Sequence, residues 1–473
     1  MQTWDQLLNS NRRKKAGRPA EPKDATETRT EIERDFDRIL FSTPVRRLAD
    51  KTQVFPLDKN DSVRTRLTHS YEVSNLARSI GTALAFEHGV ADSTTNSKRD
   101  IPALLAATGL VHDLGNPPFG HQGEIAIQSW FAQHAGILCG LATDQQKQDF
   151  LKFEGNAQGF RLVTRLQLLN DDFGLDLTYA TLAAMMKYPI GSDQTIQEHV
   201  AKKKHGFFAA EQHVVEQVHA ATGLTYGRRH PLAYVMEACD DIAYVVLDTE
   251  DSVKKGLASF SDLMAFLQHD GAADPLIAHV IKQSQEKHGQ HLRAGLSPAE
   301  LNDVSMQRFR VFAVGAMVKA AIKTFVDTQG AFMAGDVEKS LLALSPAEPL
   351  RKTLKSFGLK HGYTHPSVLR IELEGDHVIR GLMDLFWAAI RDVGADSRRK
   401  HPFTRFVYGR ISENYRRIFE NPNPADTALP FRYRECILLT DMISGMTDSF
   451  AMDLFRDLKS LQGDFDTSQF LVN

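Results

Sequence analysis

Apolar residues recur along most of the chain at the three- and four-residue spacing of helices that bury one face. The repeat is clear over residues 62–88, where one face carries His69, Val73, Leu76, Ile80 and Leu84. A strand is indicated at one place, residues 368–373, ahead of the turn-like residues 374–376. The pattern therefore predicts a mainly α protein with a minor β-hairpin.

One apolar run ends in a polar turn over residues 112–124. Gly115, Pro117 and Pro118 stop a helix here, because proline lacks an N–H group and glycine loses more entropy in a helix. Ionisable or amide side chains are dense within these thirteen residues and include His112, Asp113, Asn116, His121 and Glu124. A polar helix end followed by a surface loop is the simpler interpretation, but the density of such groups among apolar residues favours a site.

A second segment, residues 231–251, predicts a helix that starts at a proline, which suits a first helical turn. Asp240, Tyr244 and Asp248 follow one another at four-residue intervals and form one polar seam. An exposed acidic stripe fits poorly, because apolar residues flank the seam. Burial of such a carboxylate is costly unless it is paired or binds a cation.

Composition excludes several classes. Of the 473 residues, 42% are hydrophobic and 24% charged, as in ordinary globular proteins, and the net charge of −3 gives no global basic field for nucleic acid. Cys139, Cys239 and Cys436 are far apart and odd in number, which predicts no disulfide framework and a reducing, cytoplasmic setting. Because the chain has no long apolar run, no membrane span is expected. Because the N-terminal residues are polar and basic, secretion is not expected either.

The expected organisation has three parts. Residues 1–30 are basic and polar and are predicted to form a mostly disordered arm, with a solvated tail preferred over a contact to nucleic acid or a partner. Residues 31–256 contain both polar segments and are predicted to form the core domain. Residues 257–473 are predicted to be a helical region that packs on the core and contributes an oligomer interface.

Together the polar segments supply two imidazoles and two carboxylates, from His69, His112, Asp113 and Asp240. Taken alone, a histidine such as His69 on an apolar face is usually a core residue, so His69 is a candidate ligand only because the other three residues complete the set. This mixed set suits Mg²⁺, Mn²⁺, Fe²⁺ or Zn²⁺ and does not suit a thiolate-binding metal. Such a metal lowers the pKa of bound water and neutralises phosphate charge.

Other polar residues fit the same chemistry. His121 and Glu124 lie one turn apart, so the carboxylate is expected to orient the imidazole for proton transfer. Lys187, Arg66 and Tyr244 are candidate hydrogen-bond donors that would bind the phosphate. The sequence therefore predicts metal-assisted hydrolysis of a phosphate ester or anhydride.

The spacing of His69, the His112–Asp113 pair and Asp240 resembles the metal signature of the HD phosphohydrolase superfamily. Further stretches resemble the bacterial deoxyguanosine triphosphate triphosphohydrolases (dGTPases), in the expected order over about residues 32–455: 51–57, 64–70, 112–124, 153–158, 187–189, 240–244 and 444–448. The resemblance implies an HD-domain helical bundle with a C-terminal helical extension. It also implies hydrolysis at the α-phosphate of a deoxynucleoside triphosphate, which releases the nucleoside and triphosphate.

The resemblance also implies roles for single residues. The implied metal ligands are His69, His112, Asp113 and Asp240. His121 and Glu124 become the catalytic pair, in which His121 protonates the leaving 5′ oxygen or positions the attacking water. Gln53 and Asp248 match positions that contact the deoxyribose, and Tyr244 packs where a 2′-hydroxyl would clash. The residues implied on the triphosphate side are Arg66, Asn116, Lys187 and Tyr188.

The implied partners are dGTP or another deoxynucleoside triphosphate, and a divalent metal, Mg²⁺ or Mn²⁺ first, with Fe²⁺ or Zn²⁺ as alternatives. A homo-oligomer is expected, with a hexamer as the arrangement the family suggests, and single-stranded DNA or a nucleotide is a candidate activator. Residues 89–100 and 136–150 do not align, which leaves base selectivity open.

Three alternatives remain. A broad-specificity deoxynucleotide triphosphohydrolase, or another HD-type nucleotide phosphohydrolase such as a 5′-nucleotidase, keeps the four metal ligands but lacks the turn at 112–124, so this turn distinguishes them. A catalytically silent nucleotide-sensing protein would be favoured if His121 or Glu124 were missing, and both are present.

Overall fold

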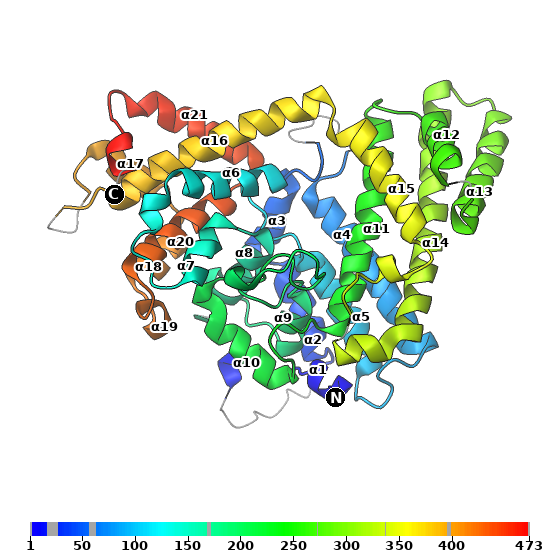
Figure 1. Ribbon diagram of the computed structural model, residues 1–473, viewed down its shortest axis with the longest axis horizontal. Helices are drawn as coiled ribbons and strands as arrows, with labels where there is room; N and C mark the ends of the chain where they lie inside the picture. The colour runs from blue at the N-terminus through cyan, green and yellow to red at the C-terminus, as the bar shows by residue number, and fades with distance from the viewer. Residues whose placement is uncertain are drawn as a thin grey trace.

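A computed structural model describes residues 2–16, 27–55, 63–167, 172–271, 273–335, 337–394 and 399–471 (Figure 1). Among these residues β-structure is limited to three isolated bridges, so the predicted mainly α fold is confirmed. Every helix in the described part of the chain is too short or too polar to cross a bilayer. The α-helices are α1 Trp4–Leu7, α2 Glu31–Leu40, α3 Thr43–Arg47, α4 Arg66–Thr82, α5 Ser97–Val111, α6 Gly120–Gln133, α7 Asp144–Leu151, α8 Gly155–Arg161, α9 Tyr179–Met185, α10 Gln212–Thr222, α11 Pro231–Lys254, α12 Phe260–Gly271, α13 Pro275–Leu292, α14 Pro298–Ala334, α15 Glu348–Gly358, α16 Pro366–Arg391, α17 Pro402–Gly409, α18 Glu413–Glu420, α19 Pro424–Thr427, α20 Phe431–Ser444 and α21 Asp448–Gln462.

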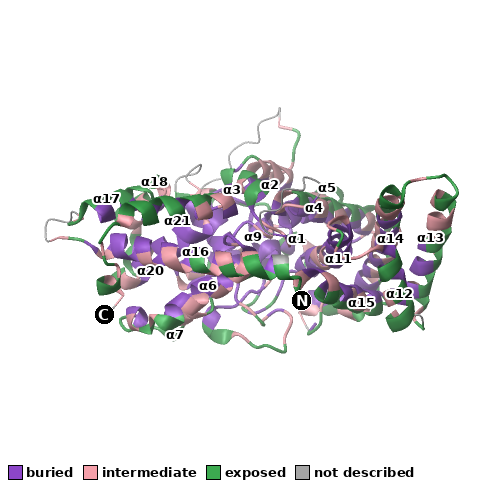
Figure 2. Cartoon of the chain, turned by 90° about the horizontal axis from the view of Figure 1, so that it is seen from above, coloured by how far each residue is buried: buried purple, intermediate pink, exposed green. Residues whose placement is uncertain are grey.

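The helices pack around two large apolar cores. One core joins α4, α5, α11 and α14, and the other joins α6, α16, α20 and α21. Figure 2 shows the resulting elongated molecule, with α12 and α13 at one end and α17 at the other, and with buried residues along its interior. The central helix α11 carries the polar seam, and α6 begins in the polar turn, so the site lies where the two cores meet.

The strand predicted at residues 368–373 is wrong, because this segment is part of α16. A stretch of six residues, four of them apolar, is too short to distinguish the two periods, and the long helix is stabilised by packing against α6 and α21 (Figure 1). Gly375 was part of the predicted turn, but in the structure it lies within α16 and allows this helix to pack closely against the side chain of Phe119. A Cβ atom there would lie 2.6 Å from Cγ of Phe119.

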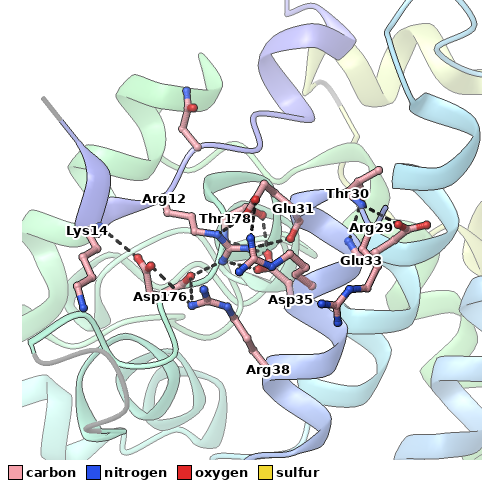
Figure 3. Close-up of polar contacts among 12 residues, drawn as sticks. Arg12, Lys14, Arg29, Thr30, Glu31, Glu33, Asp35, Arg38, Asp176 and Thr178 are labelled. Carbon is pink, nitrogen blue, oxygen red and sulfur yellow. Dashed lines mark hydrogen bonds and ion pairs between the residues drawn. The ribbon is translucent and has the colours of Figure 1, made fainter. Parts of the chain in front are cut away.

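The prediction of a disordered arm is wrong for residues 2–16, while residues 17–26 lie outside the described residues. Leu7 is fully buried, and Arg12 is 5% exposed. Figure 3 shows the Arg12 guanidinium between Glu31 and Asp35 of α2 and the carbonyl of Asp176. A cluster of basic residues in a polar stretch predicts a solvated segment, but the carboxylates that pair with Arg12 come next to it only in the folded chain.

Candidate metal centre and active site

Three helices bring the first candidate ligands together. His69 lies in α4, His112 caps the C-terminal end of α5, and Asp240 lies in the middle of α11. Nitrogen or oxygen atoms of these three side chains all lie within 4.8 Å of one another. Gly109 permits the approach of α5 to α4, because a Cβ atom there would lie 2.8 Å from Cα of Ser74. The histidine rings are consequently only 5.5 Å apart.

The hydrogen bonding of His112 fits a cation. Its Nδ1 lies 2.7 Å from the Gly109 carbonyl oxygen, which can only accept, so Nδ1 carries a hydrogen and Nε2 is the nitrogen left to bind either a proton or a cation. Nε2 is buried without a hydrogen-bond partner among the described residues, and it lies 3.5 Å from an oxygen of Asp240 and 3.5 Å from one of Asp113. Burial alone would lower the pKa of His112, but these carboxylates raise it to about 9. A divalent cation would satisfy the same atoms, and the mixed N/O donors suit Mg²⁺, Mn²⁺, Fe²⁺ or Zn²⁺.

Asp113 lies beside this cluster, and both of its oxygens are engaged. Oδ2 accepts from Arg66 at 2.7 Å, and Oδ1 accepts from the Asn116 amide at 2.6 Å. Its role as a ligand stays a prediction. Arg66 and Asn116, which we placed on the triphosphate side, both hold the carboxylate that follows His112.

The predicted catalytic pair is formed at the start of α6. Nδ1 of His121 lies 3.0 Å from Oε2 of Glu124, whose Oε1 accepts from the Gly155 N–H at 2.7 Å. The hydrogen bond to Glu124 raises the pKa of His121. Burial alone would raise the pKa of Glu124, but His121, Lys204 and the Gly155 N–H hold it below its ordinary value. The pair thus favours a protonated imidazole on an ionised carboxylate, with the His121 side chain exposed.

A glycine connects this pair to the metal side. Gly155 opens α8, and a Cβ atom there would lie 2.1 Å from Oδ1 of Asn116 and 2.9 Å from Oε1 of Glu124. Only a residue without a side chain fits between the two polar groups. The chain of contacts from Asp113 through Asn116 and Gly155 to Glu124 therefore fixes the catalytic pair relative to the candidate ligands.

Basic and aromatic groups lie on the other side of Asp240. Nζ of Lys187 is 3.3 Å from Oδ2 of Asp240 and 3.7 Å from Oε1 of Glu237. Burial alone would lower the pKa of Lys187, but Tyr188 and these carboxylates hold it well above its ordinary value. Tyr188 is buried, with the guanidinium of Arg229 5.7 Å from its ring centre. This region therefore presents a fixed positive charge next to the candidate metal ligands.

The polar seam of α11 continues into an aromatic wall. Tyr244 stacks on Tyr363 with ring centres 5.7 Å apart, and the Tyr363 hydroxyl donates to Oδ2 of Asp248 at 2.8 Å. Burial holds the pKa of Asp248 well above its ordinary value. Oδ1 of Asp248 and Oε1 of Gln53 are buried and lack a hydrogen-bond partner within the described ranges. These orphaned atoms suit hydroxyl groups of a ligand.

Sequence reasoning did not assign several of these groups. Lys204 pairs with Glu154 at 2.7 Å and lies 3.9 Å from Glu124. Burial and Glu124 raise the pKa of Glu154 to about 6. Tyr363 gave no signal, because it is 115 residues from Asp248 in sequence.

Comparison with known proteins agrees with this geometry. Residues 66–186 match the HD domain, so His69 and His112 lie inside the matched range and Asp240 beyond it. The protein is therefore a hydrolase of the HD class. Three observations agree on this: the helical fold, the clustered histidine and aspartate side chains, and the match to the HD domain.

Relatives extend over nearly the whole chain. A deoxyguanosinetriphosphate triphosphohydrolase-like protein of Listeria monocytogenes is 35% identical over 97% of this chain and 99% of its own length. A deoxyguanosinetriphosphate triphosphohydrolase of Serratia proteamaculans is 33% identical over 94% of this chain and 97% of its length. The corresponding protein of Klebsiella pneumoniae is 33% identical over 91% and 94%. The chain belongs to the deoxyguanosinetriphosphate triphosphohydrolase family.

Proposed function

We propose that the protein hydrolyses dGTP to deoxyguanosine and inorganic triphosphate. The observation that carries the proposal is the His121–Glu124 pair, 3.0 Å apart, on the turn that directly follows the candidate ligands His112 and Asp113. The names of the relatives support the substrate.

In this proposal His69, His112, Asp113 and Asp240 hold a divalent metal, Mg²⁺ or Mn²⁺. When bound, such a metal neutralises phosphate charge and lowers the pKa of water. The unpartnered, buried Nε2 of His112 supports this assignment.

The proposed acid is His121. Water adds to the α-phosphorus, the bond from that phosphorus to the 5′ oxygen breaks, and Nε2 of His121 gives its proton to the departing oxygen. The attacking water loses a proton to solvent, and the imidazole takes one back from solvent, so His121 is protonated again at the end of the cycle. Glu124 holds Nδ1 at the opposite side of the ring and stabilises the protonated imidazole. Because Glu124 is itself fixed by the Gly155 N–H, the ring is oriented before substrate binds.

Lys187 and Tyr188 bind the triphosphate, and Arg66 and Asn116 support this side through Asp113. Gln53 and Asp248 bind the deoxyribose hydroxyl through their orphaned atoms. Tyr244, held flat against Tyr363, fills the space at C2′. A site that hydrogen-bonds a substrate hydroxyl rejects analogues without it, because its own polar groups stay unpaired.

We further propose a cytoplasmic homo-oligomer, with a hexamer as the family's arrangement and single-stranded DNA or a nucleotide as activator. A broad-specificity deoxynucleoside triphosphohydrolase is the second candidate, since the groups described above contact phosphate and sugar and leave the base open.

Product analysis tests the proposal. The protein is incubated with each of the four deoxynucleoside triphosphates and Mn²⁺ or Mg²⁺, and the products are separated by ion-exchange chromatography. Triphosphate from dGTP alone is expected, and triphosphate from all four would favour the second candidate. Orthophosphate or pyrophosphate as the first product would refute both.

A further inference from the structure

The turn between the metal ligands and the catalytic pair is held from outside the HD domain. Lys51, 4% exposed, donates from Nζ to the carbonyl oxygen of Asn116 at 2.6 Å and to that of Ser444 at 2.8 Å. These contacts join the loop before α4 and the end of α20 to the middle of the turn. Neither Lys51 nor Ser444 has a part in the proposed chemistry.

Asp448, the first residue of α21, makes a second connection and is 1% exposed. Its Oδ1 accepts from the N–H of Phe119 at 3.0 Å. Its Oδ2 accepts from the N–H of Thr52 at 2.9 Å and from the Thr52 hydroxyl. One buried carboxylate therefore joins α21, the loop before α4 and the residue that precedes α6.

Phe119 has an unusual backbone. Its φ of 60° and ψ of 16° lie in the left-handed region, which a bulky residue rarely adopts without external support. It is the N-cap of α6, and its side chain makes no capping hydrogen bond. The support comes from two sides, since Asp448 holds the N–H and α16 covers the ring at Gly375, where a Cβ atom would lie 2.6 Å from Cγ of Phe119.

We propose that Asp448, Phe119 and Gly375 form a clamp that sets the position of His121 and Glu124, and that Asp448 is a positioning residue for the reaction. This inference rests on the proposed function of that pair. The clamp explains why the stretch 444–448, more than 300 residues from the turn in sequence, contributes to the site.

The physical reason lies in the distance along α6. His121 follows Phe119 by two residues, so a change of the Phe119 backbone rotates the first turn of α6 and moves the imidazole. A misplacement of about 1 Å at a reacting group can cost about 100-fold in rate. Neither the candidate ligands on α4, α5 and α11 nor Asp113, which is held by Arg66 and Asn116, makes the clamp contacts described here, so we expect metal binding to stay intact.

The first test replaces Asp448. Asp448→Ala is expected to lower kcat for dGTP by roughly 10- to 100-fold, with KM and metal content close to wild type. Hydrogen exchange of the Phe119 amide, followed by mass spectrometry of peptides spanning 115–124, is expected to accelerate. Asp448→Asn keeps an acceptor for Phe119 and retains more activity. Ser449→Ala is the matched control. The Ser449 hydroxyl donates to Asp50 and so also joins α21 to the loop before α4, but it does this at the exposed surface.

The second test reaches the clamp from the opposite side. Gly375→Ala places a methyl group against the Phe119 ring and is expected to lower kcat without changing KM or metal content. Alanine favours a helix, so loss of α16 does not account for the effect. Gly330→Ala in α14 is the control, since a Cβ atom there meets nothing within 4 Å. This pair decides the question if Asp448→Ala does not fold.

Wild-type kcat in Gly375→Ala, or an unchanged exchange rate of the 115–124 peptides in Asp448→Ala, overturns the clamp. A fall in metal content equal to the fall in kcat also overturns it, because the role would then be general integrity of the centre. Failure of the proposed function is separate, since it appears as absence of triphosphate from wild-type protein while the exchange experiment still reports on the clamp.

Discussion

Arg12 offers a quantitative test of the N-terminal segment. It donates to Oε2 of Glu31 at 2.7 Å and to Oδ1 of Asp35 at 2.7 Å, and the Asp35 side chain is fully buried (Figure 3). The substitution Arg12→Met keeps most of the side-chain volume and removes the charge. Asp35 is then left as a buried carboxylate without its cation.

Removal of one partner from a buried ion pair costs about 3–5 kcal/mol, because the remaining charge is uncompensated. Oδ2 of Asp35 keeps hydrogen bonds from the Thr178 N–H and hydroxyl at 2.9 and 2.6 Å and from the Thr181 hydroxyl at 2.6 Å, so we expect the lower end, about 3 kcal/mol. An unfolding entropy of about 2.1 cal/mol/K per residue gives about 1 kcal/mol/K for 473 residues. The expected fall in Tm is therefore about 3 °C.

Differential scanning calorimetry measures this shift. Arg29→Met is the matched control, because Arg29 also pairs with two carboxylates, of Glu27 and Asp37, but its side chain is 51% exposed. We expect a Tm close to wild type for Arg29→Met and partial recovery when Asp35→Asn is added to Arg12→Met. Equal effects of the two arginine substitutions would refute the reasoning, as would a further loss of stability in the double variant.

Four further predictions concern the site. Asp240→Ala is expected to abolish metal binding by elemental analysis, whereas Asp241→Asn retains it; the reverse result would exclude Asp240 as a ligand. His121→Ala is expected to keep metal and bind a non-hydrolysable dGTP analogue in calorimetric titration, while kcat falls by roughly two to four orders of magnitude; an equal loss of affinity would make His121 a binding residue. Because the hydrogen bond to Glu124 raises the pKa of His121, Glu124→Gln should lower that pKa and move the alkaline fall of the residual kcat to lower pH, and an unchanged pH–rate profile would contradict the pairing. Tyr244→Ala should raise kcat/KM for GTP relative to dGTP and leave 2′,3′-dideoxyguanosine triphosphate a poor substrate, whereas equal values for dGTP and GTP on wild type would refute the role of the seam.

Local sequence was sufficient where a single element decides the arrangement. The helical period placed His69 on the buried face of α4, and the four-residue spacing placed Asp240, Tyr244 and Asp248 on one face of α11. Glycine and proline set the turn after His112, so the His121–Glu124 pair followed from a separation of three residues on a helix. These features depend on backbone geometry within one or two turns, which the order of residues fixes directly.

Tertiary structure decided what depends on distant partners. Residues 368–373 have strand-like composition, yet they form the first turns of α16, whose later residues pack along α6 and α21. Arg12 is charged in a polar stretch, yet it is buried because Asp35 and Glu31 meet it from α2. The contacts of Tyr363 with Asp248 and of Asp448 with Phe119 join residues 115 and 329 positions apart. The free energy of burying an ion pair or a carboxylate depends on which groups surround it in the folded chain, and a one-dimensional pattern does not contain that information.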